Sequence, residues 1–151
     1  MFVNHLLGGK TMKYICEIII DAPIKHVTSI FANHDHLKAW QPGLVNVEKV
    51  KGDKVNYRLI FKMGKQEMVM KETIEKLSLP NTYIAIYQMP GVWNRCVNQF
   101  EASGDQTLWT MESEFQFEKE NHLPQDHFEQ KTLSGMKLFK TYVESMENTY
   151  A

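Results

Sequence analysis

Residues 54–75 read KVNYRLIFKMGKQEMVMKETIE, the pattern of two antiparallel strands joined by a tight turn. The central Gly64-Lys65 suits a two-residue type II′ turn, because glycine readily adopts the positive φ of the first central position. This turn determines which residues lie opposite each other. Apolar pairs then share one face and pairs of opposite charge share the other: Val55–Ile74, Leu59–Met70 and Phe61–Met68, against Lys54–Glu75 and Lys62–Glu67. A shift by one residue would mix the two faces, so we predict this register.

The same register places Tyr57 opposite Glu72, with both side chains on the apolar, inner face. Arg58 opposite Lys71 is the one unfavourable pair, and it lies outside. A carboxyl group in an apolar cavity can work as a general acid or base, or hold the polar end of a ligand. The alternative is a structural carboxylate at the cavity rim, or one tied to the tyrosine hydroxyl and the nearby backbone. Glu72, oriented by Tyr57, is the sharpest candidate site.

A second hairpin is predicted around Gly104-Asp105 by the same reasoning. It places four pairs on the inner face: Phe100–Trp109, Asn98–Met111, Cys96–Ser113 and Asn94–Phe115. Arg95 then meets Glu114 on the outer face, where an ion pair contributes little to stability. Both arginines of the chain are therefore expected to point away from the interior.

The turn at Pro90-Gly91 leaves two readings open, because this dipeptide favours type I and II turns rather than the primed hairpin turns. A two-residue loop turns Tyr83, Ala85 and Tyr87 inward. A three-residue loop turns the intervening isoleucines, Ile84 and Ile86, inward instead. We predict the two-residue loop.

The remaining segments complete an α+β fold. Alternation predicts seven strands in all: Lys13–Asp21, Val45–Lys51, Lys54–Met63, Gln66–Leu77, Thr82–Met89, Val92–Ala102 and Gln106–Glu118. Two short helices follow the first strand, one starting at Asp21-Pro23 and ending near Asn33, the other running from Asp35 to just before Pro42. Beyond Pro124, one helical stripe is formed by Phe128, Thr132, Met136, Phe139, Val143 and Met146. We predict a curved seven-stranded antiparallel sheet wrapped around this long C-terminal helix, with a concave side that one helix cannot fill.

The composition of the chain limits the classes of function that it can have. The 151 residues, 43% of them hydrophobic, suffice for one core, and a net charge of -1 without clustered lysines argues against a nucleic-acid partner. Cys16 and Cys96 are too few for a disulfide scaffold and a closing meander separates them by the last strand, so both are expected to be free thiols in a reducing compartment. The sequence shows neither a secretory signal nor a stretch of membrane-spanning length, so we expect a cytoplasmic protein. We expect no cofactor, no membrane insertion, and a monomer or weak homodimer.

The N-terminal residues match nothing downstream, so residues 1–11 are interpreted as a disordered or non-native extension and residues 12–151 as the domain. Leu7 to Met12 could be encoded by a stretch resembling a bacterial ribosome-binding site followed by a start codon. Met12 is therefore our hypothesis for the native start. Mass spectrometry of the protein made from its own gene tests it, and an N-terminus at Met1 would refute it.

Several short motifs in this order resemble the START-like (SRPBCC) superfamily, in particular its polyketide cyclase/dehydrase and lipid-transport branch. They are EIIIDAP at Glu17–Pro23, HLKAWQPG at His36–Gly43, ETIEKLSLP at Glu72–Pro80 and FEASGDQT at Phe100–Thr107. The resemblance implies a helix-grip fold with a deep cavity between sheet and helix, in which relatives carry lipids, hormones and polyketides or cyclise them. Cyclase relatives are expected to place basic groups in the cavity, and the outward arginines depart from that pattern.

The leading hypothesis is a non-enzymatic protein that binds or carries a small hydrophobic molecule. Its predicted ligand contacts are Tyr57, Leu59, Phe61, Met68, Met70, Glu72, Tyr83, Tyr87, Asn94, Asn98, Trp109, Met111, Phe115, Met136 and Phe139. One alternative is a dehydratase, cyclase or hydrolase with Glu72 as acid or base, and another is a protein-interaction module. The spacing of His34-Asp35-His36 is one at which metals sometimes bind, but Asp35 is better interpreted as a helix N-cap, and no metal is expected.

Overall fold

The computed structural model describes residues 11–52 and 55–150, with side chains as far as Met146. The predicted Lys54–Glu75 pair and most of the N-terminal segment lie outside the described residues. The elements in chain order are β1 (Thr11–Ile20), α1 (Ile24–Ala32), η2 (His34–His36), α2 (Leu37–Trp40), β2 (Leu44–Val50), β3 (Val55–Met63), β4 (Gln66–Ser78), β5 (Thr82–Met89), β6 (Val92–Ser103), β7 (Gln106–Phe117) and α3 (Gln125–Tyr150).

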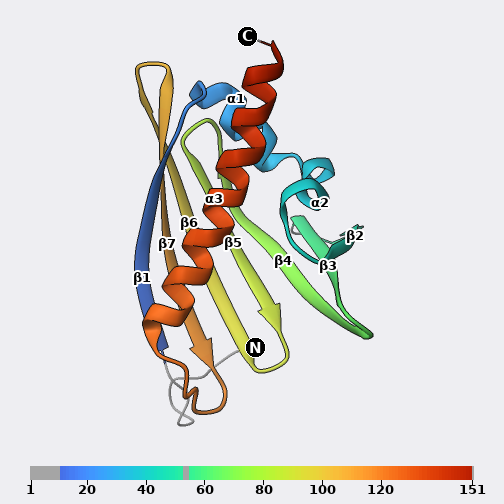
Figure 1. Cartoon of the computed structure of the whole chain (residues 1–151). Coiled ribbons are helices and arrows are strands. Elements are labelled where there is room, and N and C mark those ends of the chain that lie inside the picture. The colour runs from blue at the N-terminus through green and yellow to red at the C-terminus, as the bar shows by residue number, and fades with distance from the viewer. Residues whose placement is uncertain (1–10, 53–54, 151) are drawn as a thin grey trace.

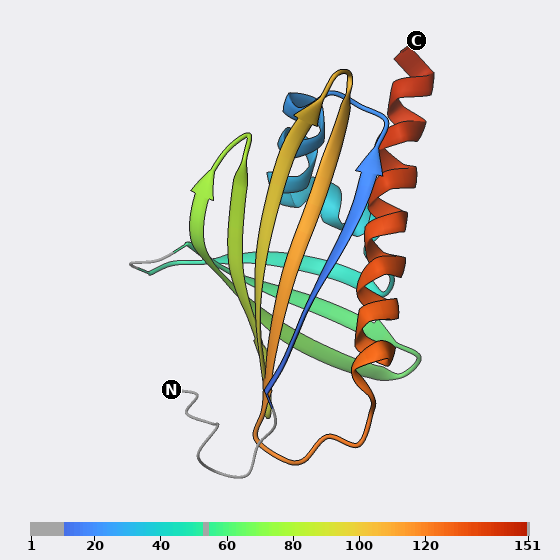
Figure 2. The same cartoon turned by 90° about the vertical axis from the view of Figure 1, so that its left-hand side faces the viewer.

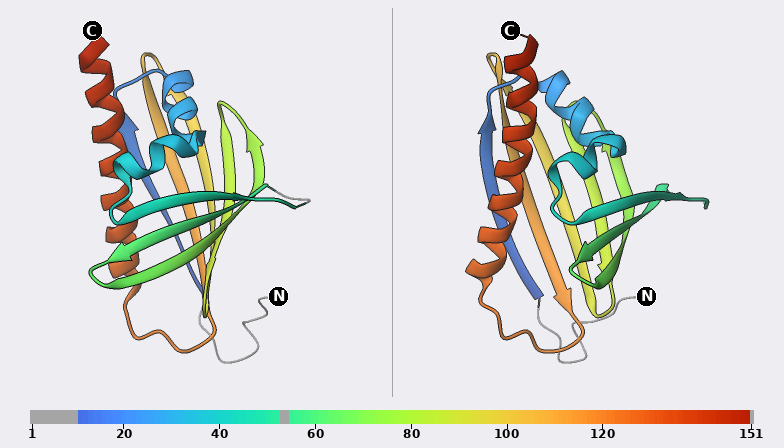
Figure 3. Two further views of the ribbon diagram at one scale, coloured as in Figure 1. Left: turned by 90° about the vertical axis from the view of Figure 1, so that its right-hand side faces the viewer. Right: turned by 45° about the vertical axis from the view of Figure 1, so that its right-hand side comes forward.

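The seven strands form one antiparallel sheet in the order β1-β7-β6-β5-β4-β3-β2. Figure 1 shows α3 lying across the concave face of this sheet. Seen from the side, α3 runs along the edge strand β1, which it contacts (Figure 2). The short helices α1 and α2 lie on the same side of the sheet as α3, and β2, β3 and β4 bend across toward it (Figure 3). The predicted fold class is therefore confirmed.

Both registers that the glycine turns predict are present. In the first hairpin Tyr57 lies opposite Glu72 and Phe61 opposite Met68, and Gly64 has a φ of 64°. In the second hairpin Asn98 lies opposite Met111 and Cys96 opposite Ser113, and the other two predicted pairs are also present. The registers follow from turn chemistry and face alternation, which act within a few residues. Both registers could therefore be predicted without the tertiary structure.

The Pro90-Gly91 turn has the two-residue loop, with Met89 paired to Val92. Gly91 takes a φ of 78°, the geometry that a type II turn requires at its second central residue. As a result Tyr83 and Ala85 are buried on the inner face. The prediction that the tyrosines face inward is confirmed.

The main apolar core includes the place where α1 meets the sheet and α3. The ring of Phe31, on α1, lies 5.1–5.4 Å edge-on from four other aromatic rings, those of Tyr83, Phe100, Trp109 and Phe139. Such edge-to-face contacts stabilise a core beyond the area that they bury. Phe31 therefore fills the space between sheet and helix at this end, and the rest of the concave face is left for the cavity described below.

The predicted ion pair of Arg95 with Glu114 is wrong. Arg95 lies opposite Glu114 in the register, but its guanidinium donates two hydrogen bonds, of 3.1 and 2.7 Å, to Glu75 on β4. The pairing of β4 with β5 shifts between Ile74 and Lys76, so Glu75 sits in an irregular stretch from which its carboxylate meets Arg95 two strands away. A bidentate arginine–carboxylate pair is the stronger contact.

The predicted helix starts also differ. Asp35 is not an N-cap: the side chain of Asn33 takes that role and accepts the backbone N–H of Asp35 at 3.0 Å. Helix α1 has Pro23 at its N-cap position and no side-chain cap, so Asp21 does not serve it. The backbone N–H of Asp21 instead donates to Glu144 on α3, at 2.8 Å.

Candidate functional site

A cavity of about 410 Å³ lies between the inner face of the sheet, α2 and α3. Of the predicted ligand contacts, eleven line it: Phe61, Met68, Met70, Glu72, Tyr83, Tyr87, Asn94, Asn98, Trp109, Met111 and Met136. Sequence reasoning missed the other lining residues: Phe31, His34, Leu37, Trp40, Gln41, Pro42, Cys96, Ser113, Lys131, Thr132 and Gly135. Most of the missed residues lie on the helices, whose position over the sheet is set only by the tertiary fold.

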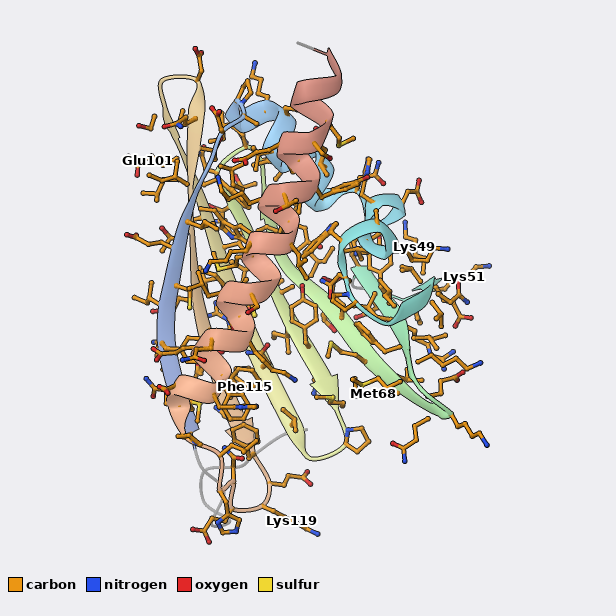
Figure 4. All side chains as sticks on the ribbon, in the orientation of Figure 1. Lys49, Lys51, Met68, Glu101, Phe115 and Lys119 are labelled. Atoms are coloured by element: carbon orange, nitrogen blue, oxygen red, sulfur yellow. The ribbon has the colours of Figure 1, made fainter. Side chains whose placement is uncertain are left out.

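Four predicted ligand contacts do not line this cavity. Leu59 is packed with Leu37 and Leu44 in a second apolar cluster, and Phe139 is fully buried in the main core. Phe115 lies beside the first turns of α3 (Figure 4). The ring of Phe115 is packed against those of Phe117 and Phe128. Tyr57, the fourth, is turned toward His34.

The Glu72 carboxylate is buried and accepts hydrogen bonds at both oxygens. Oε1 lies 2.5 Å from Nε2 of His34, and Oε2 accepts the hydroxyl groups of Tyr87 at 2.6 Å and Tyr83 at 3.4 Å. Burial, and next the charge of Glu72, raise the pKa of both tyrosines. Their hydroxyls therefore remain protonated donors over the whole physiological range.

Tyr57 does not hold Glu72 directly, contrary to the prediction. Its ring stacks on that of His34, with centroids 3.6 Å apart and planes inclined by 11°. Burial, followed by the charge of Glu72, raises the pKa of its hydroxyl. Tyr57 thus fixes the plane of the imidazole, and the imidazole contacts Glu72.

The contact of His34 with Glu72 is the feature of the site that the sequence did not reveal. His34 lies in the three-residue η2 segment, 38 positions before Glu72, and no spacing rule connects the two. Its ring borders both the cavity and a second, more polar depression that includes Lys38 and Lys49. Lys49 and its neighbour Lys51 project away from α3 (Figure 4).

The two asparagines of the cavity have partners within the protein. Asn98 donates to the carbonyl of Tyr83 at 3.1 Å and accepts the indole N–H of Trp109 at 2.9 Å. Asn94 donates to Ser113 at 2.9 Å and to a backbone carbonyl at 3.0 Å. It also accepts the thiol of Cys96, whose pKa is raised by burial to about 12. The amides are therefore satisfied without a ligand.

Charge at the cavity is sparse. Lys131, on α3, lines it but is exposed to solvent. Arg58 bonds Glu48 at 2.8 Å and Arg95 bonds Glu75, and neither lines the cavity, so the outward arginines are confirmed.

Cys16 and Cys96 are free thiols. Among the described residues no group of three or more His, Cys, Asp or Glu side chains could hold a metal ion. In the same part of the chain, no helix has the length and apolar character needed to cross a membrane.

Comparison with models of known protein families gives no match, and no curated protein matches the sequence. Solved structures do match. Ara h 8.0201 superposes with a TM-score of 0.75 at 13% identity, over 90% of this chain and 99% of that one. The Zhui aromatase/cyclase from Streptomyces sp. R1128 gives 0.72 at 12% identity, over 89% and 94% of the two chains. Truncated norcoclaurine synthase from Thalictrum flavum gives 0.65 at 15% identity, over 93% and 98%.

At such identities the likeness concerns the backbone alone. It extends over nearly the full length of each compared chain and includes the bent sheet, the paired short helices and the long last helix. The chain has a helix-grip fold, which it shares with these three structures.

Proposed function

We propose that this protein binds a small, mainly apolar molecule in the cavity between its sheet and α3. The observation that carries the proposal is the cavity itself, which at about 410 Å³ falls in the range of ligand sites. Its walls include four methionines, at positions 68, 70, 111 and 136. Methionine side chains adapt to ligands of different shape, so these walls suit an apolar ligand better than a strongly polar one.

A glycine on α3 supports this proposal. Gly135 lies in the interior of the helix and lines the cavity, and a Cβ added there would have no atom within 4 Å. Glycine in a helix interior is unfavourable by about 0.5–1 kcal/mol relative to alanine. Stability alone therefore favours a larger residue, whereas free space for a ligand favours glycine.

Native mass spectrometry of the full chain purified from its own host tests the proposal. We expect a bound molecule of a few hundred daltons, released on denaturation. Gly135→Phe places a ring in the open space and should abolish this adduct, while Gly135→Ala, the matched control, should keep it. Wild-type protein that carries no adduct and binds no member of an apolar compound library would refute the proposal.

The contact between His34 and Glu72 favours a second candidate, an enzyme of the dehydratase, cyclase or hydrolase type. A carboxylate-bound imidazole in a cavity wall is an arrangement that can accept and return a proton. The solved structures with this fold include an aromatase/cyclase and a synthase. If screening of apolar carbonyl compounds finds a turnover, Glu72→Gln should remove it and leave ligand affinity within about threefold.

A further inference from the structure

The polar groups of the cavity wall are already committed to one another, with few exceptions. Both oxygens of Glu72 are occupied, and Asn94 and Asn98 use their amides within the sheet. The indole N–H of Trp40 has no acceptor in the described part of the chain, but this atom is covered and cannot reach a ligand. A ligand must therefore find its hydrogen-bond partner among the groups that remain on the described wall, chiefly the side chains of Gln41, Lys131 and His34, of which only His34 is held in place by other side chains.

His34 provides such a group. One ring nitrogen, Nε2, contacts Glu72, and no hydrogen bond to the other, Nδ1, is present among the described residues. Tyr57 holds the ring plane from one side, and the side chain is only 12% exposed. The imidazole is thus pre-oriented before any ligand arrives, which lowers the entropy cost of a contact with it.

We propose that His34 is the polar contact for the bound molecule and that this molecule presents a neutral hydroxyl group on an apolar ring system. This inference rests on the proposed function, since it names the class of ligand that the cavity would take. Glu72 and Tyr57 act as positioning residues and do not touch the ligand.

The hydroxyl group follows from the two roles that Nδ1 of His34 can take. When Nε2 carries the only ring proton and donates it to Glu72, Nδ1 is an acceptor and a ligand hydroxyl donates to it. When the pair has taken up one more proton from solvent, Nδ1 carries a proton of its own and the same hydroxyl oxygen accepts it. An ether or a ketone can satisfy only the second arrangement, whereas a hydroxyl satisfies both.

Charged ligands fit the wall less well. A ligand carboxylate at His34 would lie close to the buried Glu72 carboxylate, and like charges in an apolar cavity repel strongly. A ligand ammonium would lose its hydration on entering the cavity, and both oxygens of Glu72, which would attract it, already accept bonds from His34 and the two tyrosines. A neutral hydroxyl avoids both costs.

The test compares three probes of one shape on the full-length protein: naphthalene, 2-naphthol and 2-methoxynaphthalene. Calorimetry should show 2-naphthol binding at least about tenfold more tightly than 2-methoxynaphthalene, about 1.4 kcal/mol, as expected for one satisfied hydrogen bond. In His34→Gln, which keeps an amide near Glu72 but has no Nδ1, the preference should fall below about threefold while naphthalene affinity is retained. Lys131→Met, at the rim, should keep the preference.

A measurement on the wild type covers the case in which His34→Gln does not fold. The ¹⁵N resonance of His34 Nδ1 should move on addition of 2-naphthol and stay in place with naphthalene. Equal affinities for 2-naphthol and its methyl ether, an unmoved resonance, or a preference that survives in folded His34→Gln would each overturn the inference and leave the proposed function standing. Failure of all three probes to bind below millimolar concentration would count against both.

Discussion

The imidazole of His34 and the carboxylate of Glu72 meet at 2.5 Å, although one belongs to a short helical segment and the other to the middle of β4. Two tyrosine hydroxyls complete the contacts of the carboxylate, and Tyr57 stacks on the imidazole. The polar part of the cavity wall is thus one connected network, and its members are expected to respond together when one is changed.

Glu72→Gln should destabilise the fold by about 1–3 kcal/mol. The glutamine amide replaces one acceptor oxygen by an NH2 group, so that two hydrogen-bond donors face each other. The charge-assisted hydrogen bonds of the carboxylate are also lost. Urea unfolding at pH 7 measures the effect. Glu67→Gln, on the exposed face of the same strand, is the control and should stay within about 0.5 kcal/mol. Equal stability of the two variants would contradict the network.

Trp40 and Trp109 should respond differently to replacement by phenylalanine. The indole N–H of Trp109 donates to Asn98 at 2.9 Å, whereas that of Trp40 has no acceptor among the described residues. Removing the paired indole donor leaves the side-chain oxygen of Asn98 without a partner. Removing the unpaired one relieves the free-energy cost of a buried donor that has no acceptor. We expect Trp109→Phe to be more destabilising by about 1–3 kcal/mol, measured by urea unfolding. Similar losses for both would show that Trp40 has a partner after all.

Gly135→Ala should raise the free energy of unfolding by about 0.5–1 kcal/mol. The new methyl group meets no atom within 4 Å, so only the gain in helix propensity counts. Thermal unfolding of the two proteins without ligand measures the gain. A destabilised Gly135→Ala would mean that the space beside this glycine is already filled.

The two thiols should react at different rates. Burial raises the pKa of Cys96 to about 12 and also raises that of Cys16, which is only partly buried. Since the thiolate is the reactive form, both should react slowly, and Cys96 at least about tenfold more slowly than Cys16. Labelling of Cys16→Ser and Cys96→Ser with a disulfide reagent at pH 8 separates the two rates. Equal labelling rates of the two thiols in the folded protein would contradict the deeper burial of Cys96.

Glu144 should contribute a small, pH-dependent stability. Burial alone would raise its pKa, but hydrogen bonds from Lys140 and from the backbone N–H of Asp21 outweigh burial and lower it. A lowered folded-state pKa means that the contribution is present above the ordinary value of 4.5 and is lost as the pH falls through the lowered one. Glu144→Gln should therefore narrow the stability difference between pH 7 and pH 3, by less than about 1 kcal/mol. The exposed Glu101→Gln is the control for urea unfolding at the two pH values, and an unchanged difference in Glu144→Gln would refute the assignment.

Sequence alone determined the strands, their registers and the direction in which most inner residues point. Gly64 and Gly104 specified hairpins whose pairs could be listed in advance, and the stripe of α3 followed from its helical period. These features depend on residues a few positions apart, where turn geometry and alternation leave little choice. Even the inward tyrosines followed from the length of one loop.

Only the tertiary structure decided which residues meet from separate elements. The bend of the sheet and the placement of η2 bring His34 into contact with Glu72. An irregularity in β4 allows Glu75 to pair with Arg95. Such contacts depend on curvature accumulated over many residues and on the packing of helices against the sheet, neither of which leaves a local pattern. The cavity could be expected because one helix cannot cover a concave sheet, but its polar contact could not, because it is made by a helical segment and a strand 38 residues apart.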